Sequence, residues 1–180
     1  MVSINVSKKW LLQEVKCSEQ DLLEALPQVK AGLDKEEGDL LSLEVTGDRP
    51  DLLSKYGVAR ALKGFFGTEK GTPLPKYPSS GVKIIAEKDA LAIRPVVVGA
   101  IIENASFSPE EVTEIFEQQE KLDLTNGRRR KKVSIGLYDL KNLKPPFYFK
   151  AVDPVKTSFI PLKRDFPLSL KQILEEHEKG

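Results

Sequence analysis

A stretch rich in proline and glycine divides this sequence into two halves that are expected to fold separately. Residues 67–81 read GTEKGTPLPKYPSSG, with three prolines, three glycines and two serines. Too few apolar side chains remain there to hold a packed element, so the stretch is predicted to be an interdomain linker. At 180 residues the chain suits one domain of ordinary size or two small ones, and the linker favours two.

The first half alternates short strand and helix patterns. Alternating apolar residues indicate strands, apolar residues at helical spacing indicate helices, and serine is a favoured residue at a helix start. The predicted elements are a strand at 2–6, a helix capped by Ser7, a helix from Ser18 to Pro27, a strand at 41–45, and a helix that begins at Asp51 or Ser54 and ends at Gly67.

The second half adds further strand and helix patterns, and the whole chain is predicted to be of the α+β class. Residues 95–102 are almost continuously apolar, which predicts a strand buried on both faces. Ser108, Pro109 and the two acids after them form a helix start, and Asn126-Gly127 is a stop. The remaining predictions are strands at 82–85 and 133–137 and a last helix from Leu168 to His177, capped by Ser169.

Composition narrows the function classes. Lys+Arg 28 against Asp+Glu 27 gives no support for strong non-specific binding to nucleic acid, so any such surface must be local. The single cysteine, Cys17, excludes an intramolecular disulfide and favours a reducing compartment. The sequence contains no apolar block of signal-peptide or membrane-spanning length. A cytoplasmic protein without a membrane role is expected.

The sequence offers few groups for catalysis or metal binding. One histidine, His177, and one cysteine cannot supply a structural site of nitrogen and sulfur ligands. A Ser-His or Cys-His pair would also have to use His177, close to the carboxyl terminus. No glycine-rich phosphate loop is present. No catalytic residue, metal ligand or cofactor is therefore predicted in this chain, although a magnesium site made of carboxylates alone stays open.

A run of five cations is the sharpest electrostatic feature. It lies between the predicted helix at 108–126 and the predicted strand at 133–137, and arginine side chains match the geometry of phosphate. The alternative is a solvated turn that balances the acidic helix before it. The candidate RNA-binding residues are Arg128, Arg129, Arg130, Lys131 and Lys132, with Arg94 as a weaker candidate.

The segment 46–54 lies between a strand and a helix and has two interpretations. Asp48 and Arg49 can pair with each other or with backbone groups, and Pro50 stiffens the entry to the helix. A structural role is favoured over a ligand site.

The order of several short motifs resembles the amino-terminal region of the phenylalanyl-tRNA synthetase beta subunit, of the archaeal and eukaryotic-cytosolic type. Each motif alone is weak, but their succession at consistent spacing is specific. The motifs are DRPDLLS at 48–54, GVARAL at 57–62, IRP at 93–95, QEKL at 119–122, GRRRKKV at 127–133, SIGLYDL at 134–140 and PPF at 145–147.

This resemblance implies a ligase of two alpha and two beta chains that charges tRNA with phenylalanine, using ATP and magnesium. The alpha subunit holds the aminoacylation site, and the beta subunit contributes tRNA contacts and a hydrolytic editing domain called B3/B4. Residues 1–77 would form the amino-terminal domain, 78–81 the end of the linker, and 82–180 a partial B3/B4 domain without editing residues. The implied partners are tRNA, the alpha subunit and the remainder of the beta subunit, with no DNA.

Two single positions and the stretch Leu124-Thr125-Asn126, which does not match the family, depart from the family pattern. The family usually has histidine where this chain has Asp123 and Tyr138. These departures keep open a stand-alone, non-enzymatic paralogue that binds RNA or protein. An independent hydrolase of misacylated tRNA is disfavoured, because no nucleophile or base is in view.

Overall fold

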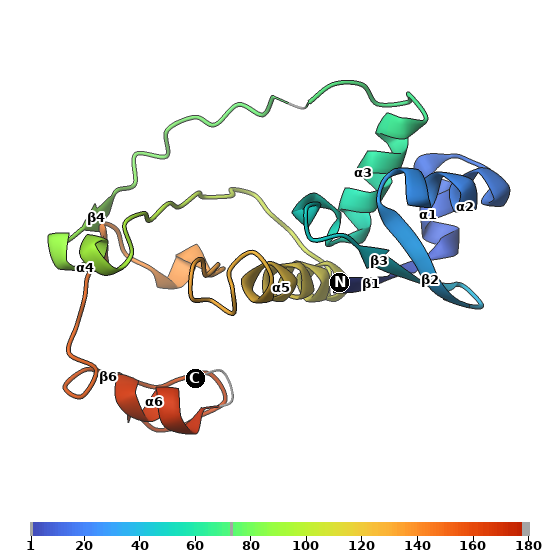
Figure 1. Cartoon of the computed structure of the whole chain (residues 1–180). Coiled ribbons are helices and arrows are strands. Elements are labelled where there is room, and N and C mark those ends of the chain that lie inside the picture. Colours follow the sequence, from blue (N-terminus) through green and yellow to red (C-terminus); the bar gives the residue numbers. More distant parts are fainter. Residues whose placement is uncertain (1, 73, 178–180) are drawn as a thin grey trace. The chain divides into compact units, whose positions relative to one another are not determined.

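The chain folds into two compact units, each made of two segments that are separate in the sequence. The computed structural model describes residues 2–72 and 74–177. The first unit comprises residues 1–76 and 104–138, and the second comprises residues 77–103 and 139–180 (Figure 1). The chain therefore leaves the first unit close to the predicted boundary at Tyr77, but residues 104–138 return to it. The assignment of 1–77 and 82–180 to two domains stays a prediction, and residue 73 of the linker lies outside the described residues.

Small sheets and short helices make up both units, so the predicted α+β class is confirmed. The first unit contains β1 (Val2–Ser7), α1 (Lys8–Val15), α2 (Glu19–Gln28), β2 (Ala31–Glu37), β3 (Leu40–Val45), the 3-10 helix η1 (Pro50–Leu52), α3 (Lys55–Phe65) and α5 (Pro109–Leu124). The second contains β4 (Ile84–Ala86), α4 (Lys88–Ile93), η2 (Leu140–Asn142), β5 (Phe147–Phe149), β6 (Ser158–Phe159), β7 (Leu168–Ser169) and α6 (Leu170–Glu176).

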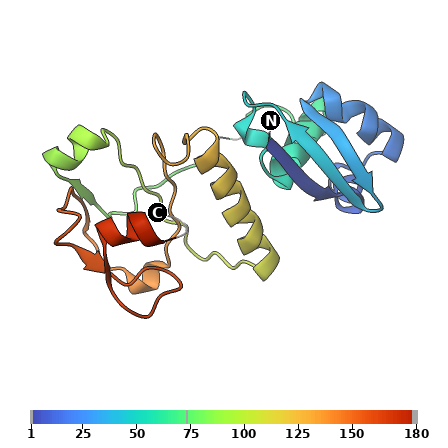
Figure 2. The same cartoon turned by 60° about the horizontal axis from the view of Figure 1, so that its bottom comes forward.

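A three-stranded antiparallel sheet is the frame of the first unit. Its order is β1-β3-β2, with Ile4 opposite Leu43 and Val6 opposite Leu41. These side chains are buried, whereas Ser3 and Asn5 on the other face of β1 are exposed. Because successive side chains of a strand point to opposite faces, one face of the sheet is apolar. The helices α1, α2 and α3 cover that face (Figure 2).

The sequence gives no strand pattern for β2. Only its first residue, Ala31, is fully buried, and the strand ends in Asp, Lys and Glu residues. It lies at the edge of the sheet and is held by its pairing with β3, which shifts register between Leu33 and Lys35. An edge strand can be held by backbone hydrogen bonds to its neighbour without burying one face. The pattern of apolar residues therefore does not predict β2.

Serine side chains start the helices of the first unit, as predicted. Ser7, Ser18 and Ser54 accept hydrogen bonds from the backbone of Trp10, Asp21 and Gly57, at 3.1, 3.1 and 3.2 Å. Of the two predicted starts for α3, Ser54 is therefore correct. The buried helical residues pack on the sheet as one core, made up of Leu11, Val15, Leu22, Ala25, Leu26, Val58, Ala59 and Leu62.

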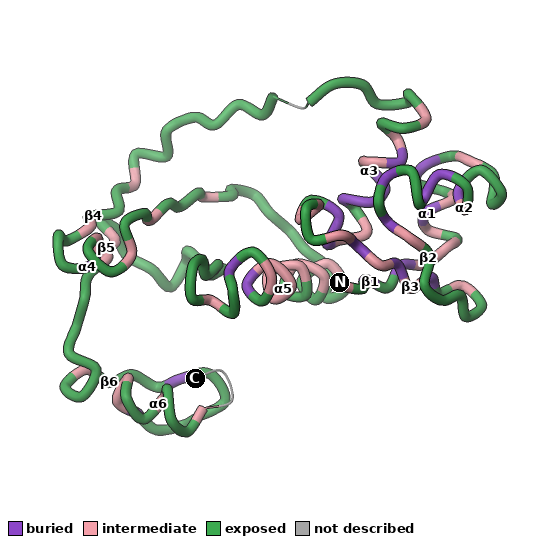
Figure 3. Tube along the Cα trace, in the orientation of Figure 1, coloured by how far each residue is buried: buried purple, intermediate pink, exposed green. Residues whose placement is uncertain are grey.

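The second unit has little buried apolar surface, and the predicted strand at 95–102 is wrong. This segment has no strand partner among the described residues, and Val96, Val98 and Ile102 are 73%, 85% and 71% exposed. Figure 3 shows the contrast between the two units in burial. An apolar run indicates that a segment favours burial, but the covering element must come from elsewhere in the fold. Among the described residues, no strand or helix buries Val96, Val98 and Ile102.

The predicted strand at 133–137 is wrong for the same reason. Residues 133–137 are not assigned to a strand, and Val133 and Leu137 are exposed. Two other predictions in the second half are confirmed. Residues 84–86 form β4, which pairs in parallel with β5, and Ser169 caps the last helix, α6, through a capping box with Gln172.

Gly57 marks the tightest backbone approach in the first unit. A Cβ atom at this position would lie 1.8 Å from the carbonyl oxygen of Asp51. Replacing Gly57 by alanine must therefore push α3 away from η1. We expect Gly57→Ala to lower the free energy of unfolding by roughly 1–3 kcal/mol or more, measured by urea denaturation.

Gly47 provides the matched control. A Cβ atom there would meet nothing within 4 Å, so Gly47→Ala should be close to neutral. Equal unfolding midpoints for Gly57→Ala and the unchanged chain would contradict the predicted clash.

Candidate nucleic-acid interface

The candidate interface begins with helix α5, which is fixed on the first unit. Ser108 and Glu111 form a capping box at its start. Glu114 forms an ion pair of 2.7 Å with Lys55 of α3, and Leu122 packs against the core. The Lys55 ammonium also lies 5.2 Å from the ring centroid of Trp10, a distance suited to a cation–π contact. The ion pair holds the first half of α5, and Leu122 holds its last turn against the core.

A tight turn follows α5 and carries all five cations. The buried Gly127 opens it, and a Cβ atom there would lie 2.5 Å from the carbonyl oxygen of Asp123 and 2.6 Å from that of Val133. Only glycine fits this approach. The next three residues have positive φ angles of 49, 54 and 62 degrees, and they are Arg128, Arg129 and Arg130. Left-handed backbone is unfavourable for residues with a Cβ atom, and a run of three is unusual.

Backbone hydrogen bonds hold this turn against the end of α5. The amide groups of Gly127, Arg129 and Arg130 donate to the carbonyl oxygens of Leu122, Leu124 and Asp123, at 2.9, 3.2 and 3.1 Å. The Lys132 amide closes the turn by donating to Gly127 at 2.9 Å. The last carbonyls of a helix lack partners within it, and the turn supplies them here. The basic run is therefore built into the structure.

Asp123 anchors the turn from inside. Its side chain is 1% exposed. One carboxylate oxygen accepts from the backbone of Ile135 at 3.1 Å, and the other accepts from Nε of Arg130 at 3.2 Å. A buried carboxylate needs such partners, because an unpaired one would be strongly unfavourable. Arg130 is thus committed to an internal ion pair.

The other four cations point to solvent. Their side chains are exposed, and none makes an ion pair with any residue that the structure describes. These residues are Arg128, Arg129, Lys131 and Lys132. Unpaired cations on a fixed turn can bind phosphate groups without first losing an internal partner.

Arg94, the sixth candidate, is not part of this turn. It follows α4 in the second unit, is partly buried and is not free of partners. The role of Asp123 was not apparent from the sequence, where it stood out only as a departure from the family pattern. Its spacing to Gly127 and Arg130 at a helix end could have indicated an anchor.

The segment 48–51 has a structural role, as its sequence favoured, but Asp48 and Arg49 pair with Lys30 and Asp51 rather than with each other. Arg49 donates from Nε and Nη2 to the two carboxylate oxygens of Asp51, at 2.9 and 2.8 Å, and from Nη1 to the carbonyl oxygen of Val29, at 3.1 Å. Lys30 pairs with Asp48 and lowers the pKa of that carboxyl group to about 2. The segment thus ties η1 to the end of α2.

The pair of Arg49 and Asp51 gives the first unit a pH dependence. Arg49 lowers the pKa of Asp51 below its ordinary value. The stability from this pair is therefore fully present above the unfolded pKa of about 3.9 and is lost as the pH falls through the folded pKa. We expect Asp51→Asn to lower the free energy of unfolding at neutral pH by about 1 kcal/mol or less, because the pair is partly exposed.

The same substitution should flatten the loss of stability in acid, measured by urea unfolding across a series of pH values. Asp34→Asn is the control, because Asp34 is an exposed carboxylate on β2 without an ion pair among the described residues. An acid profile unchanged by Asp51→Asn would contradict the assignment.

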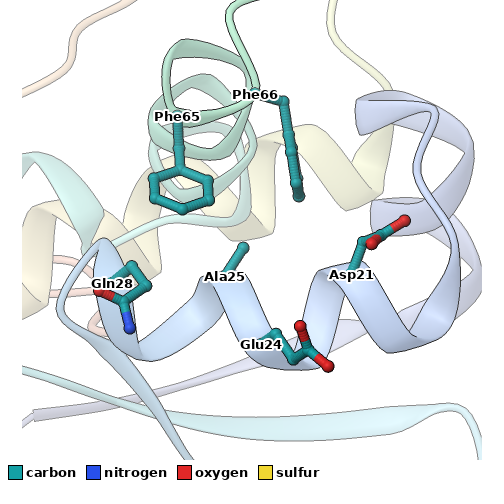
Figure 4. A pocket seen from close by; sticks show the side chains of 6 residues that line it. All are labelled: Asp21, Glu24, Ala25, Gln28, Phe65 and Phe66. Atoms are coloured by element: carbon teal, nitrogen blue, oxygen red, sulfur yellow. The ribbon is translucent and has the colours of Figure 1, made fainter.

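A shallow hollow between α2 and the end of α3 shows no catalytic arrangement. Its volume is about 540 Å³, and Phe65 on its wall is 52% exposed. The Asp21 carboxylate at its edge accepts a hydrogen bond from Ser18, as part of the helix start. Figure 4 shows the lining residues, which are Asp21, Glu24, Ala25, Gln28, Phe65 and Phe66.

Neither a metal cluster nor a membrane-spanning helix is found in the part of the chain that the structure describes. Within residues 2–72 and 74–177, no three His, Cys, Asp or Glu side chains converge as metal ligands. The His177 ring lies 3.0 Å from the carbonyl oxygen of Leu162, far from the basic turn in sequence. No helix among the described residues has the length and apolar character needed to cross a bilayer.

Comparison with known proteins places the chain among relatives of aminoacyl-tRNA synthetase subunits. No protein-family model matches it. The phenylalanine–tRNA ligase beta subunit of Archaeoglobus fulgidus is 40% identical over 88% of this chain and 29% of that protein. The corresponding beta subunit of Metallosphaera sedula is 37% identical over 100% of this chain and 33% of that protein.

A solved structure gives the same result. The crystal structure of an N-terminal fragment of the phenylalanyl-tRNA synthetase beta subunit from Pyrococcus horikoshii aligns with a TM-score of 0.86 and 34% identity, over 98% of this chain and 53% of that one. The chain is thus homologous to the N-terminal region of the archaeal-type phenylalanyl-tRNA synthetase beta subunit. It spans about a quarter to a third of the length of the beta subunits that it matches.

Proposed function

We propose that this chain is a structural and binding part of phenylalanine–tRNA ligase, with contacts to tRNA, the alpha subunit and the remainder of the beta subunit. Its similarity to beta subunits over almost its whole length supports this proposal. ATP and magnesium then belong to the reaction of the whole ligase, in the cytoplasm. The proposed contribution of this chain is structural support and binding to tRNA and to the other parts of the ligase.

The exposed apolar segment at 95–102 is the observation that supports a protein partner. Val96 and Val98 are largely exposed, and clustered exposed apolar residues favour a protein interface. The proposed cover is the remainder of the beta subunit, because the relatives of this chain are about three times as long. Burial of this segment by that polypeptide would complete the apolar packing that the second unit lacks.

An assembly experiment tests this partner. The unchanged chain and the variant Val96→Asp/Val98→Asp are each mixed with the separately expressed remainder of the beta subunit and with the alpha subunit. We expect the variant to bind at least tenfold more weakly, because burial of an unpaired carboxylate costs several kcal/mol and about 1.4 kcal/mol corresponds to tenfold. Size-exclusion chromatography and calorimetry measure the complex.

Leu74→Asp is the matched control, since Leu74 is 89% exposed in the linker. It should leave assembly unchanged. Equal binding by the Val96→Asp/Val98→Asp variant and the unchanged chain, or an equal loss with Leu74→Asp, would contradict the proposal.

The basic turn supports the proposal of a tRNA contact. Replacement of all five cations by serine is expected to weaken binding of a phenylalanine tRNA transcript and to reduce its salt dependence, because each phosphate contact releases counterions. Fluorescence anisotropy across about 50 to 200 mM salt measures both. Affinity that survives the replacement would refute this RNA contact. The replaced residues are Arg128, Arg129, Arg130, Lys131 and Lys132.

A stand-alone, non-enzymatic paralogue remains the alternative. The replacement of family histidines by Asp123 and Tyr138 favours it. In the assembly experiment this alternative predicts no binding to the remainder of the beta subunit, together with retained binding to RNA or to another protein.

A further inference from the structure

We infer that the turn at 127–132 is a preorganised phosphate-binding site with divided roles, in which Arg130 is a positioning residue held by Asp123. The inference rests on the proposed tRNA contact and specifies how that contact is made. The residues assigned to RNA phosphates are the four exposed cations, Arg128, Arg129, Lys131 and Lys132.

The backbone of the turn is the first argument. Three consecutive arginines adopt left-handed φ angles, which residues with a Cβ atom adopt as a run only where surrounding contacts hold them. A solvated turn without a function could relax to ordinary angles. A turn that must present cations in one arrangement gains from being fixed, because less freedom is then lost on binding.

The position of Asp123 is the second argument. Its carboxylate contacts Arg130 within the turn and the backbone of Ile135 beyond it, so one buried group joins both sides of the turn. Gly127 permits the close approach of the backbone that this arrangement requires. Loss of the carboxylate should therefore loosen the whole turn. The hydrophobic core of the first unit does not include Asp123 and should stay folded.

The charge balance is the third argument. Asp123 compensates the charge of Arg130, so the turn presents four free cations. Nε of Arg130 already donates to the Asp123 carboxylate, so this guanidinium would have to share its charge and its donors between that carboxylate and a phosphate. The exposed four require no such sharing.

The test separates position from charge in the full chain, with a phenylalanine tRNA transcript as the probe. The double variant Asp123→Asn/Arg130→Gln removes the anchor but keeps the number of free cations and the net charge. We expect roughly threefold to tenfold weaker binding, through lost preorganisation, with an unchanged dependence of log K on log salt. Hydrogen exchange should show faster exchange at the amides of Arg129 and Lys132, with β3 still protected.

Asp123→Asn alone is a second variant, for which a role in charge and a role in positioning predict opposite changes in RNA affinity. It removes a negative charge next to the turn, so charge alone predicts tighter binding, whereas positioning predicts weaker binding. Tighter binding by Asp123→Asn, or binding by the double variant equal to that of the unchanged chain, would overturn the division of roles.

The variant Arg128→Ser/Arg129→Ser/Lys131→Ser/Lys132→Ser tests the underlying RNA contact separately. It should lower the slope of log K against log salt by about 3, from four phosphate contacts at about 0.7–0.9 each. Its control makes the same change in net charge at exposed lysines elsewhere, Lys70, Lys76, Lys144 and Lys150. A slope equal to that of the unchanged chain would refute the tRNA contact itself, whatever the anchor variants do.

Discussion

Burial of apolar side chains against the central strand β3 is the constraint on which the rest of the structure depends. Leu41, Leu43 and Val45 are fully buried and lie against the helices that cover the sheet. Since each buried aliphatic side chain contributes roughly 1.5–3 kcal/mol, this packing gives the first unit its own stable core. The ion pair of Lys55 with Glu114 and the packing of Leu122 then fix α5 on that frame.

The basic turn is ordered because it is bonded to the end of α5, which packs on this core. Its backbone bonds reach the last carbonyls of α5, and its anchor, Asp123, is the penultimate residue of that helix. The strain of three left-handed arginines is tolerated because glycine, helix carbonyls and a buried carboxylate all act on the same few residues. By charge alone the five cations are equivalent, but packing pairs one of them, Arg130, with the buried carboxylate of Asp123.

The second unit contrasts with the first because few of its described apolar side chains are buried. Among its described residues, the buried apolar side chains are Ala90, Pro161 and Leu168. The segment at 95–102 has the composition of an interior strand, but no strand within residues 2–72 and 74–177 pairs with it. The chain spans about a third of the length of the beta subunit of Metallosphaera sedula.

Local sequence determined those elements whose stability is local. Serine caps, alternating apolar residues and the glycine after α3 set most of the boundaries in the first unit, because each acts within a few residues. The basic run was equally plain from its composition. Tertiary structure decided what depends on distant partners: the pairing of the polar strand β2, the lack of cover over 95–102 and the return of residues 104–138 to the first unit. It also decided that Asp123 holds Arg130, because burial of a carboxylate depends on how the chain around it packs, which no local pattern specifies.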